Sequence, residues 1–521
     1  MTLWVLGDQL NHAAVRRLAP KRVLLVEAYE LGRTPPMHPQ KLVLFFSAMR
    51  HFAQELREGG LEAPSKEAVG RNVGPHEAPR NERLEVIYLQ AETLAEALAA
   101  FFRAHPGETL VQMQPADYGF AERARALVEG LGGAYRLLPN PLWLLPPEAF
   151  DRWAGSRKTY RLEYFYRFMR QRTGHLMQGG QPVGGAWNYD AENRKTPPPS
   201  YRPPPPLRFS PDALTRQAMA TVQEKFTGHF GALEGFDWPV TRQEALQALE
   251  DFVLHRLAQF GPYQDSLVEQ SWSMNHSLLS PAINLGLLHP QEVVERALAE
   301  YEKGGIPLAS IEGFVRQIIG WREYIYHVYR REMPGLGQAN QMGAHRPLPP
   351  LFWGAPTQMR CLSTVIERVR QRGYAHHIER LMVLANFALL YGVNPQELNT
   401  WFIAAFVDSA DWVMAPNVLG MGVFASPVLS SKPYAASGKY IARMGNHCQH
   451  CSFRVEETLG ERACPFNSLY WDFMAGQRER LEANPRLGVL YKTWDKRNQK
   501  EQAAVRHQAQ QLRQRMAQGE V

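Results

Sequence analysis

The chain changes its hydrophobic pattern at one proline-rich segment, and this change restricts the possible folds more than any other feature. Residues 197–206 read Pro-Pro-Pro-Ser-Tyr-Arg-Pro-Pro-Pro-Pro. Proline lacks the backbone N–H, so this run cannot lie inside a helix or a sheet, and it favours a stiff, extended conformation. A proline-rich recognition motif is one interpretation. We favour a connection between two differently built parts of the chain.

Before this segment, short apolar runs alternate with amphipathic stretches. Helical patterns over 40–56 and 94–102 separate apolar runs that have the length of strands. These runs cover residues 3–6, 23–26, 86–89 and 110–113. Strands that alternate with helices predict a parallel sheet covered by helices, so we expect an α/β domain over residues 1–140. Gly7-Asp8-Gln9 follows the first run, where such sheets bind ligands, although a plain turn is an equally good interpretation.

After the segment, the pattern is almost wholly helical. Apolar residues recur at i, i+3, i+4 spacing over 293–301, 311–330, 362–372 and 378–390. We therefore expect a large all-α domain over residues 210–497, with 141–209 connecting the two domains. Residues 498–521 are polar and basic with little apolar face, which predicts a solvated terminal helix rather than an arm that binds DNA.

Length and composition are typical of a soluble globular protein. With 521 residues the chain is too long for one core. No apolar run approaches the length of a membrane span, and the apolar start lacks the basic region and cleavage site of an export signal. We expect a cytoplasmic protein with no membrane partner. The net charge of +7 permits a polyanionic partner such as DNA without requiring one.

The four cysteines lie in the last third of the chain, which favours a metal site over disulfides. Cys448, Cys451 and Cys464 form C-x2-C-x12-C, and Cys361 is remote in sequence. Four thiolates are the full ligand set of a structural zinc or of a [4Fe–4S] cluster. One remote ligand, and a proline directly after the last cysteine, favour the cluster over zinc. The plainer alternative is a C-x-x-C pair that binds nothing, with two core cysteines.

Two segments of the helical part carry residues suited to phosphate binding and to acid–base chemistry. Ser277 and Ser280 place hydroxyls just before a proline that can begin a helix, which suits a diphosphate, although Ser-Pro is also a common helix start. His376 and His377 open a predicted helix, with Arg380 one turn on. A helix N-terminus disfavours a charged imidazole, which suits an acid–base histidine. Exposed histidines at a helix start are the alternative.

Two further segments add aromatic and charged side chains. Trp321-Arg322-Glu323 places a ring, a guanidinium and a carboxylate at consecutive positions of a predicted helix. These residues could line a nucleotide pocket or lie on a surface. Asp408 and Asp411 are three residues apart, so we expect both carboxylates on one helical face, where they could pair with Arg380.

In combination, these segments resemble the flavin-binding domain of the photolyase/cryptochrome family. Ser277-x-x-Ser280 resembles the family's flavin-phosphate loop, and Trp321-Arg322-Glu323 resembles its helix beside flavin and substrate. His376-His377-x-x-Arg380 resembles a motif of animal (6-4) photolyases, and Asp408 with Asp411 resembles the family's Asp-x-Asp with one extra residue. The four cysteines match one branch, the iron–sulfur bacterial cryptochromes and photolyases, or prokaryotic (6-4) photolyase group. Other stretches typical of that branch are 7–10, 47–52, 187–195 and 261–265.

The resemblance, which extends from residue 1 to about 495, implies light-dependent repair of (6-4) pyrimidine–pyrimidone photoproducts in DNA. Photoexcited, reduced FAD would supply the electron, and His377, with His376 beside it, would protonate the lesion. Trp401 and Trp353 would carry electrons to the flavin. The residues implied to hold FAD are Tyr263, Ser277, Leu278, Ser280, Trp321, Arg380, Asp408, Asp411 and Asn417.

The same resemblance implies two further cofactors and a partner. Cys361, Cys448, Cys451 and Cys464 would ligate a [4Fe–4S] cluster. A 6,7-dimethyl-8-ribityllumazine antenna would bind the α/β domain near Asp8 and Gln9. UV-damaged DNA would bind a monomer, with Arg194 and Lys195 as candidate phosphate contacts; a solvated Arg-Lys pair is nearly as good an interpretation.

The chain departs from the family pattern at several positions. Leu381 replaces a further histidine of the animal enzymes, so a two-histidine mechanism would depend on His376. Gln317 and an inserted Gly320 change the face of the Trp321 helix, and Phe402 stands where some relatives have tyrosine. A blue-light receptor that signals without repair is the main alternative function. An iron–sulfur protein that binds nucleic acid without photochemistry is a third.

Overall fold

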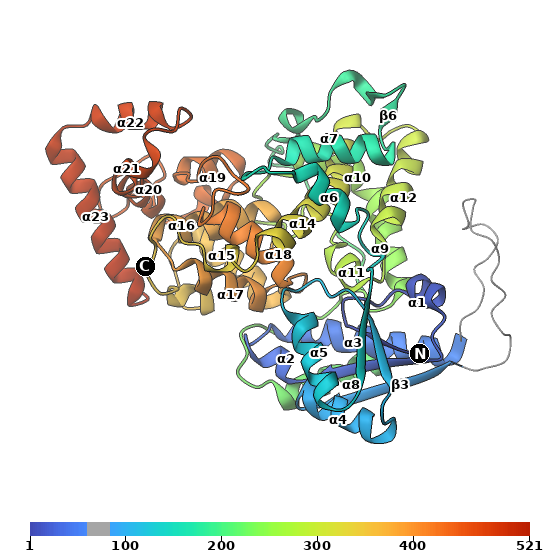
Figure 1. Cartoon of the computed structure of the whole chain (residues 1–521). Helices are drawn as coiled ribbons and strands as arrows, with labels where there is room; N and C mark the ends of the chain where they lie inside the picture. The colour runs from blue at the N-terminus through green and yellow to red at the C-terminus, as the bar shows by residue number, and fades with distance from the viewer. Residues whose placement is uncertain (60–83, 521) are drawn as a thin grey trace.

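The N-terminal part contains a parallel sheet of five strands in the order β3-β2-β1-β4-β5 (Figure 1). The computed structural model describes residues 1–59 and 84–520. The strands are β1 (Thr2–Val5), β2 (Arg22–Ala28), β3 (Glu85–Ala91), β4 (Thr109–Met113) and β5 (Ala134–Leu138). The predicted α/β region and its four strands are confirmed. The sequence did not indicate β5, because this edge strand has exposed residues among its apolar ones and no continuous apolar run.

Helices cover both faces of this sheet because side chains alternate along each strand. Leu3 and Val5 pack into the core beneath α3, whereas Trp4 faces the opposite core with α4 and α5. The helices of this part are α1 (His12–Leu18), α2 (Glu30–Arg33), α3 (Pro39–Gly59), α4 (Leu94–Ala104), α5 (Phe120–Gly130) and α8 (Ala213–Lys225). Helix α8 follows the proline-rich run and packs on α3, so the chain returns to the sheet before it enters the helical part (Figure 1).

Residues 141–209, expected to be a connection, contain structure of their own. Helices α6 (Pro147–Ala154) and α7 (Leu162–Thr173) bury Phe150, Phe165 and Tyr166 against the helical part. Short elements follow: β6 (Met177–Gln178), β7 (Gln181–Pro182), η1 (Val183–Gly185) and η2 (Asp190–Asn193). The apolar stripe of α7 is interrupted by arginines and glutamine, which hides it from a search for periodicity.

The second half of the described chain is helical, as predicted. Its α-helices are α9 (Arg242–His255), α10 (Leu257–Tyr263), α11 (Ser280–Leu285), α12 (Pro290–Glu302), α13 (Leu308–Val315), α14 (Glu323–Glu332), α15 (Arg360–Arg372), α16 (Asn386–Tyr391), α17 (Pro395–Ala405), α18 (Asp411–Ala415), α19 (Gly438–Met444), α20 (Pro465–Gly476), α21 (Arg478–Leu481), α22 (Gly488–Asp495) and α23 (Gln499–Ala517). Short 3-10 turns are η4 (Leu336–Gln338), η5 (Pro350–Trp353) and η8 (His447–His450). Local sequence defines several ends; for example, Thr241 and Glu244 form a capping box at the start of α9.

Three helices of this half contain π-helical segments with wider turns. These are η3 (Arg316–Arg322), which continues into α14, η6 (Glu379–Ala385), which continues into α16, and η7 (Pro416–Gly422), which follows α18. Such segments hold one residue more than an α-helical turn and are frequent at functional sites. Periodicity predicted helices here but not the wider turns.

The C-terminal segment forms a helix with a largely exposed surface, α23, as expected. It is not free, however: α23 packs against α20 at one edge of the molecule (Figure 1). Its buried residues, at helical spacing, are Val505, Ala509, Leu512 and Met516. Arg513 reinforces the contact with an ion pair to Asp472 at 2.5 Å. The sequence did not indicate this packing because the apolar stripe is one residue wide and lies among many polar residues. Across residues 1–59 and 84–520, no helix has both the length and the apolar character needed to cross a membrane.

Candidate functional site

A cavity of about 1390 Å³ opens in the helical half, between segments that are far apart in sequence. All three π-helical segments contribute to its wall. Their lining residues include Gln317 and Trp321 from η3, Arg380 and Leu381 from η6, and Asn417 and Met421 from η7. Ser277 and Leu278, in the loop before α11, also line it. The structure thus brings most of the predicted cofactor residues to one site.

A hydrogen-bonded network fixes the charged groups on one wall. The guanidinium of Arg380 donates to both carboxylate oxygens of Asp408, at 2.9 and 3.2 Å, and to the carbonyl of Ala375 at 2.6 Å. The Ser280 hydroxyl donates to the same carboxylate at 2.7 Å. The ring of Phe406 lies 4.1 Å from the guanidinium carbon of Arg380. The predicted pairing of Arg380 with Asp408 is therefore present, and it leaves Arg380 in one fixed orientation at the cavity.

The expected placement of Asp411 on the same face as Asp408 is wrong. Helix α18 begins at Asp411, so Asp408 lies in the preceding loop and helical spacing does not apply between them. The carboxylate of Asp411 instead accepts a hydrogen bond from Tyr329 at 2.6 Å, and the same Tyr329 oxygen accepts one from the backbone of Tyr118 in the α/β part. Asp411 therefore joins the two parts of the molecule and is not among the residues that line the cavity.

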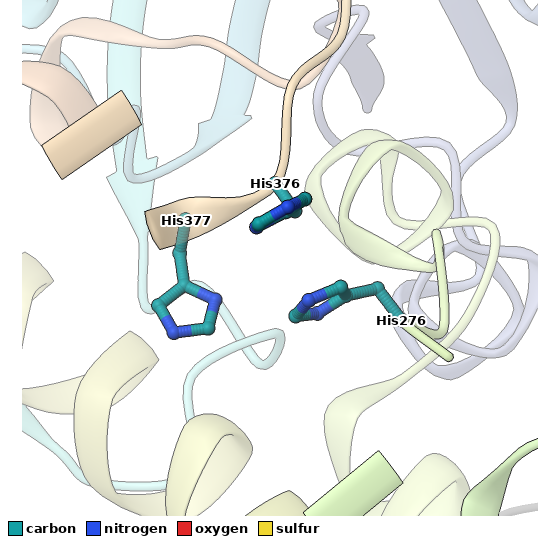
Figure 2. Close-up of side chains that lie close together, drawn as sticks. All are labelled: His276, His376 and His377. Atoms are coloured by element: carbon teal, nitrogen blue, oxygen red, sulfur yellow. The ribbon is translucent and has the colours of Figure 1, made fainter. Parts of the chain in front are cut away.

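Three imidazoles, those of His276, His376 and His377, lie together at the side of the cavity (Figure 2). The rings of His276 and His376 are stacked, with centroids 4.9 Å apart, and His377 meets His276 edge-on at 5.2 Å. Burial lowers the pKa of both His276 and His376 well below the usual value, and the neighbouring imidazoles lower it further. Both side chains are therefore neutral near pH 7.

The two predicted histidines have different surroundings. The side chain of His377 is 48% exposed, lines the cavity, and places Nε2 3.3 Å from a carboxylate oxygen of Asp265. The side chain of His376 is fully buried behind the wall. The helix begins at His377, as predicted for this pair. Of the two, only His377 lines the cavity and can meet a molecule there.

Cationic and aromatic side chains surround the cavity. Arg194, predicted to contact DNA, lines it and pairs with Asp190. Lys195 is exposed, but it is not among the residues that line the cavity. Further exposed or half-exposed lining residues are Lys432, Tyr434, Tyr440, Arg443 and Arg486.

Of the two tryptophans predicted for electron transfer, one lies at the surface and the other in the core beside the cavity wall. Trp353 is 44% exposed, and the indole N–H of the fully buried Trp401 donates to the carbonyl of Phe352 at 2.9 Å. The ring of Trp401 lies 5.3 Å from that of Phe402, which lines the cavity. Tyr263, predicted to hold a cofactor, packs against Tyr201 at 4.7 Å and is not among the lining residues.

The residues predicted to hold an antenna lie where the ends of β1 and β4 meet. The side-chain amide of Gln9 donates to the carbonyl of Met113 at 2.9 Å, so Gln9 joins the two strands. Burial, with the nearby carboxylate of Asp117, raises the pKa of Asp8 to about 7. Asp8 is therefore the chemically unusual group at this edge of the sheet.

The four cysteines surround a second, much smaller cavity of about 20 Å³. Apolar side chains such as Met359, Ile441 and Phe453 complete its wall. Burial, with the neighbouring thiols, raises the pKa of Cys448 to about 11 and that of Cys361 well above its usual value. The structure therefore joins the remote Cys361 to the C-x2-C-x12-C segment at one place.

Several lining residues were not proposed from the sequence as site residues. They include His276, which directly precedes the predicted phosphate loop, and Arg316, which directly precedes Gln317. A search for charged residues beside the predicted ones would have found Arg316. Nothing in the sequence relates His276 to His376, which is a hundred residues away.

Comparison with known proteins gives consistent results. The sequence matches the family of deoxyribodipyrimidine photo-lyase-related proteins over residues 3–69 and 76–238. It is 40% identical over 499 residues to a (6-4) photolyase of Agrobacterium fabrum, a match that covers 94% of each chain. The fold resembles a bacterial class III photolyase from Agrobacterium tumefaciens (TM-score 0.53, 18% identity, 85% of this chain and 86% of that one). It also resembles a Synechocystis cryptochrome (TM-score 0.52, 12% identity, 85% and 88%).

Proposed function

Because this chain belongs to the photolyase family, in the group of the bacterial (6-4) photolyase that it matches along 94% of its length, we propose that it repairs (6-4) photoproducts in DNA under light. The observation that carries this proposal is the composition of one cavity. It joins a fixed Arg380–Asp408 pair with the exposed imidazole of His377. A cofactor site and a proton donor for a second molecule therefore share one space.

The chemistry of the cavity fits FAD. Gln264, Arg316 and Arg322 line it, and each has a buried polar atom without a hydrogen-bond partner in the described chain: Oε1, Nη2 and Nε, respectively. Such atoms need a polar ligand or water, and FAD carries phosphates, hydroxyls and a polar ring edge. Ser277, Leu278, Ser280, Trp321, Arg380, Asp408 and Asn417 would hold it. When bound and reduced, FAD supplies the electron that light transfers to the damaged base.

His377 would donate a proton to the lesion. A damaged pair must leave the duplex to reach this cavity, and a poorly stacked pair does so at the lowest energetic cost. The Asp265 carboxylate, 3.3 Å from Nε2, would hold the imidazole ring toward the cavity. His376 is buried and would position His377 rather than contact the lesion.

The rim would hold the DNA backbone. Arg194, Lys432, Arg443 and Arg486 are cations at the cavity, and Tyr434 and Tyr440 offer rings on which bases can stack. Lys195 lies beside this rim in sequence and would contribute to the same positive field. The affinity for DNA would fall as salt concentration rises.

Trp353, Trp401 and Phe402 support a route for electrons from the surface to the flavin. The indole of Trp401 contacts the backbone next to Trp353 and the ring of Phe402 at the wall. Phenylalanine is harder to oxidise than tyrosine, so Phe402 would act as a bridge and Trp401 as the first residue oxidised.

The cysteine cavity fits a [4Fe–4S] cluster better than a zinc ion. Tetrahedral zinc with bonds of about 2.3 Å would hold four sulfurs about 3.8 Å apart. Within residues 1–59 and 84–520, however, no three cysteine sulfurs lie within 4.8 Å of one another. A cluster binds each sulfur through a different iron and so spaces them more widely. A Cβ atom at Gly438 would lie 2.7 Å from the sulfur of Cys464, so this glycine keeps the space open.

A 6,7-dimethyl-8-ribityllumazine antenna would bind at the carboxyl edge of the sheet. The order of the strands reverses between β1 and β4, which is where open parallel sheets bind ligands. Asp8 would accept hydrogen bonds from its polar ring or hydroxyls, and Gln9 would hold the strand ends in place.

A repair assay tests the proposed function. The reduced flavoprotein is bound to an oligonucleotide with one (6-4) lesion, and the absorbance of the lesion is followed under blue light and in darkness. We expect loss of the lesion only in light. No loss, with flavin and lesion binding intact, would contradict repair and favour a blue-light receptor.

A further inference from the structure

We propose that His276, His376 and His377 bind a divalent transition-metal ion, with Zn²⁺ as the best match. Each residue offers one ring nitrogen, and these three atoms all lie within 4.8 Å of one another. Within the described ranges, no other three His, Cys, Asp or Glu residues meet this condition. Figure 2 shows the three rings, from two separate segments of the chain, surrounding one small space.

Unpartnered nitrogens provide an independent reason for a ligand here. Neither ring nitrogen of His376 has a hydrogen-bond partner in the described structure, and neither does Nε2 of His276. His376 is fully buried and His276 is 7% exposed, so water in the cavity cannot reach all of them. A buried polar atom without a partner costs about 1–3 kcal/mol. One ion in the space between the rings would satisfy a nitrogen from each histidine.

The donor set suits zinc or a similar ion. Imidazole nitrogens bind zinc at about 2.0–2.1 Å, and three histidines with one open position form a known type of zinc site. A point between three atoms separated by 4.8 Å or less lies no farther than about 2.8 Å from each. Because the rings of His276 and His376 are stacked, one of them must turn about its side-chain torsion to aim its lone pair at the ion.

Carboxylates partly offset the positive charge of the arginines near the three imidazoles, which by themselves would oppose a cation. Each nearby arginine is paired with its own carboxylate: Arg256 with Asp251, Arg368 with Glu379 and Arg380 with Asp408. Asp265, beside His377, adds a negative charge on the cavity side.

An ion at this position would also control repair, a consequence that rests on the proposed function. The exposed His377 would give its nitrogen lone pair to the metal and could no longer carry the proton for the lesion. Binding of zinc and repair of DNA therefore exclude each other at one imidazole.

Zinc binding by the full-length flavoprotein tests the site directly. We expect calorimetry to show one tight Zn²⁺ per chain, and X-ray absorption at the zinc edge to show three imidazole ligands near 2.0 Å. His276→Phe keeps a ring in the stack but removes the nitrogens, and should weaken binding at least tenfold. His377→Gln, at the exposed wall, tests the same site without disturbing the core. His507→Ala, an exposed histidine on α23, is the control and should bind as the wild type does.

The outcomes separate the two proposals. The proposal of a zinc site would be wrong if the protein bound no stoichiometric zinc, or if the bound zinc had sulfur ligands near 2.3 Å. It would also be wrong if His276→Phe and His377→Gln both kept the wild-type affinity. Zinc should abolish light-driven repair, and a chelator should restore it. If repair continued at full rate with zinc bound, the proposal that zinc controls repair would be wrong. A protein that never repairs DNA would contradict the proposed function while leaving the zinc titration as the test of the site.

Discussion

The two cavities of the helical half differ in size and lining. The large one, about 1390 Å³, has charged and hydrogen-bonding groups on its wall and opens to a rim of cations. The small one, about 20 Å³, has four thiols among apolar side chains. A wall of the first kind suits a polar cofactor and a substrate that enters and leaves, whereas the second suits a group that stays bound as part of the fold.

This difference implies different responses to mutation. Many residues of the large cavity are partly exposed or lie in the π-helical segments, so changing one of these should alter chemistry and leave the fold intact. The cysteines tie α15 to the chain around α19 and α20, so losing one should affect the fold first. Each experiment below would break or sharpen this contrast.

The largest effect is expected from Cys451→Ala. Loss of one of four ligands should release the bound group and lower stability by several kcal/mol, with loss of flavin, because metal binding is coupled to folding. Thermal unfolding and the flavin absorbance of the purified variant measure both. Ser452→Ala, at the next and exposed position, is the matched control. A stable, flavin-loaded Cys451→Ala protein without iron would show that the small cavity is dispensable for the fold.

His377→Ala should retain the fold, flavin and lesion binding but lose repair by roughly 100-fold or more, as expected for a general acid. Quantum yield of repair and a binding titration measure the two properties. His345→Ala, also exposed, should repair normally. If repair by His377→Ala were unchanged, the proton would have to come from another group.

Acid should destabilise the protein through the buried histidines of the large cavity. The folded-state pKa of His276 and of His376 lies well below the unfolded value of 6.5, so the unfolded chain binds more protons as pH falls through that value. Stability should therefore be greatest above about pH 6.5 and fall by about 1.4 kcal/mol per pH unit for each such histidine below it. Urea unfolding at several pH values measures the slope. His376→Phe should reduce the slope of the free energy of unfolding against pH by the contribution of one proton. If the slope were unchanged, His376 would have to be protonated in the folded protein.

The smallest effect is expected from Arg443→Ala at the rim. Removing one phosphate contact should weaken binding of damaged and undamaged DNA to a similar extent and reduce the salt dependence of log K by about one unit. Binding titrations at several salt concentrations test this. Arg17→Ala, an exposed arginine on α1, is the control. A loss confined to damaged DNA would place Arg443 at the lesion instead of at the backbone.

The sequence predicted four strands because each contains a continuous apolar run; β1, β2 and β4 are buried on both faces, and β3 keeps such a run although it lies at an edge. It missed β5, the other edge strand, whose apolar residues are interrupted by Arg136, and the packing of α23, whose apolar stripe is one residue wide. The same limits apply to the site. Arg380 and Asp408 were predicted as partners from their charges, but the start of α18 separates Asp411 from them. The contact between His276 and His376 depends on tertiary packing, which no local pattern records.

The three π-helical segments have a consequence for how this cavity can vary. Each holds one extra residue without breaking its helix, so the chain on either side keeps its packing while the side chains within the wide turn are rotated. Gly320 in η3 lies at such a point, and the Cβ atom of any larger residue there would meet the ring of Tyr166 at 3.2 Å. Deleting one residue from a wide turn would return it to the α-helical register and aim a different set of side chains inward. Elsewhere in a protein, loops absorb single-residue insertions and deletions. Here such changes can occur inside the helices and alter which side chains face the cavity.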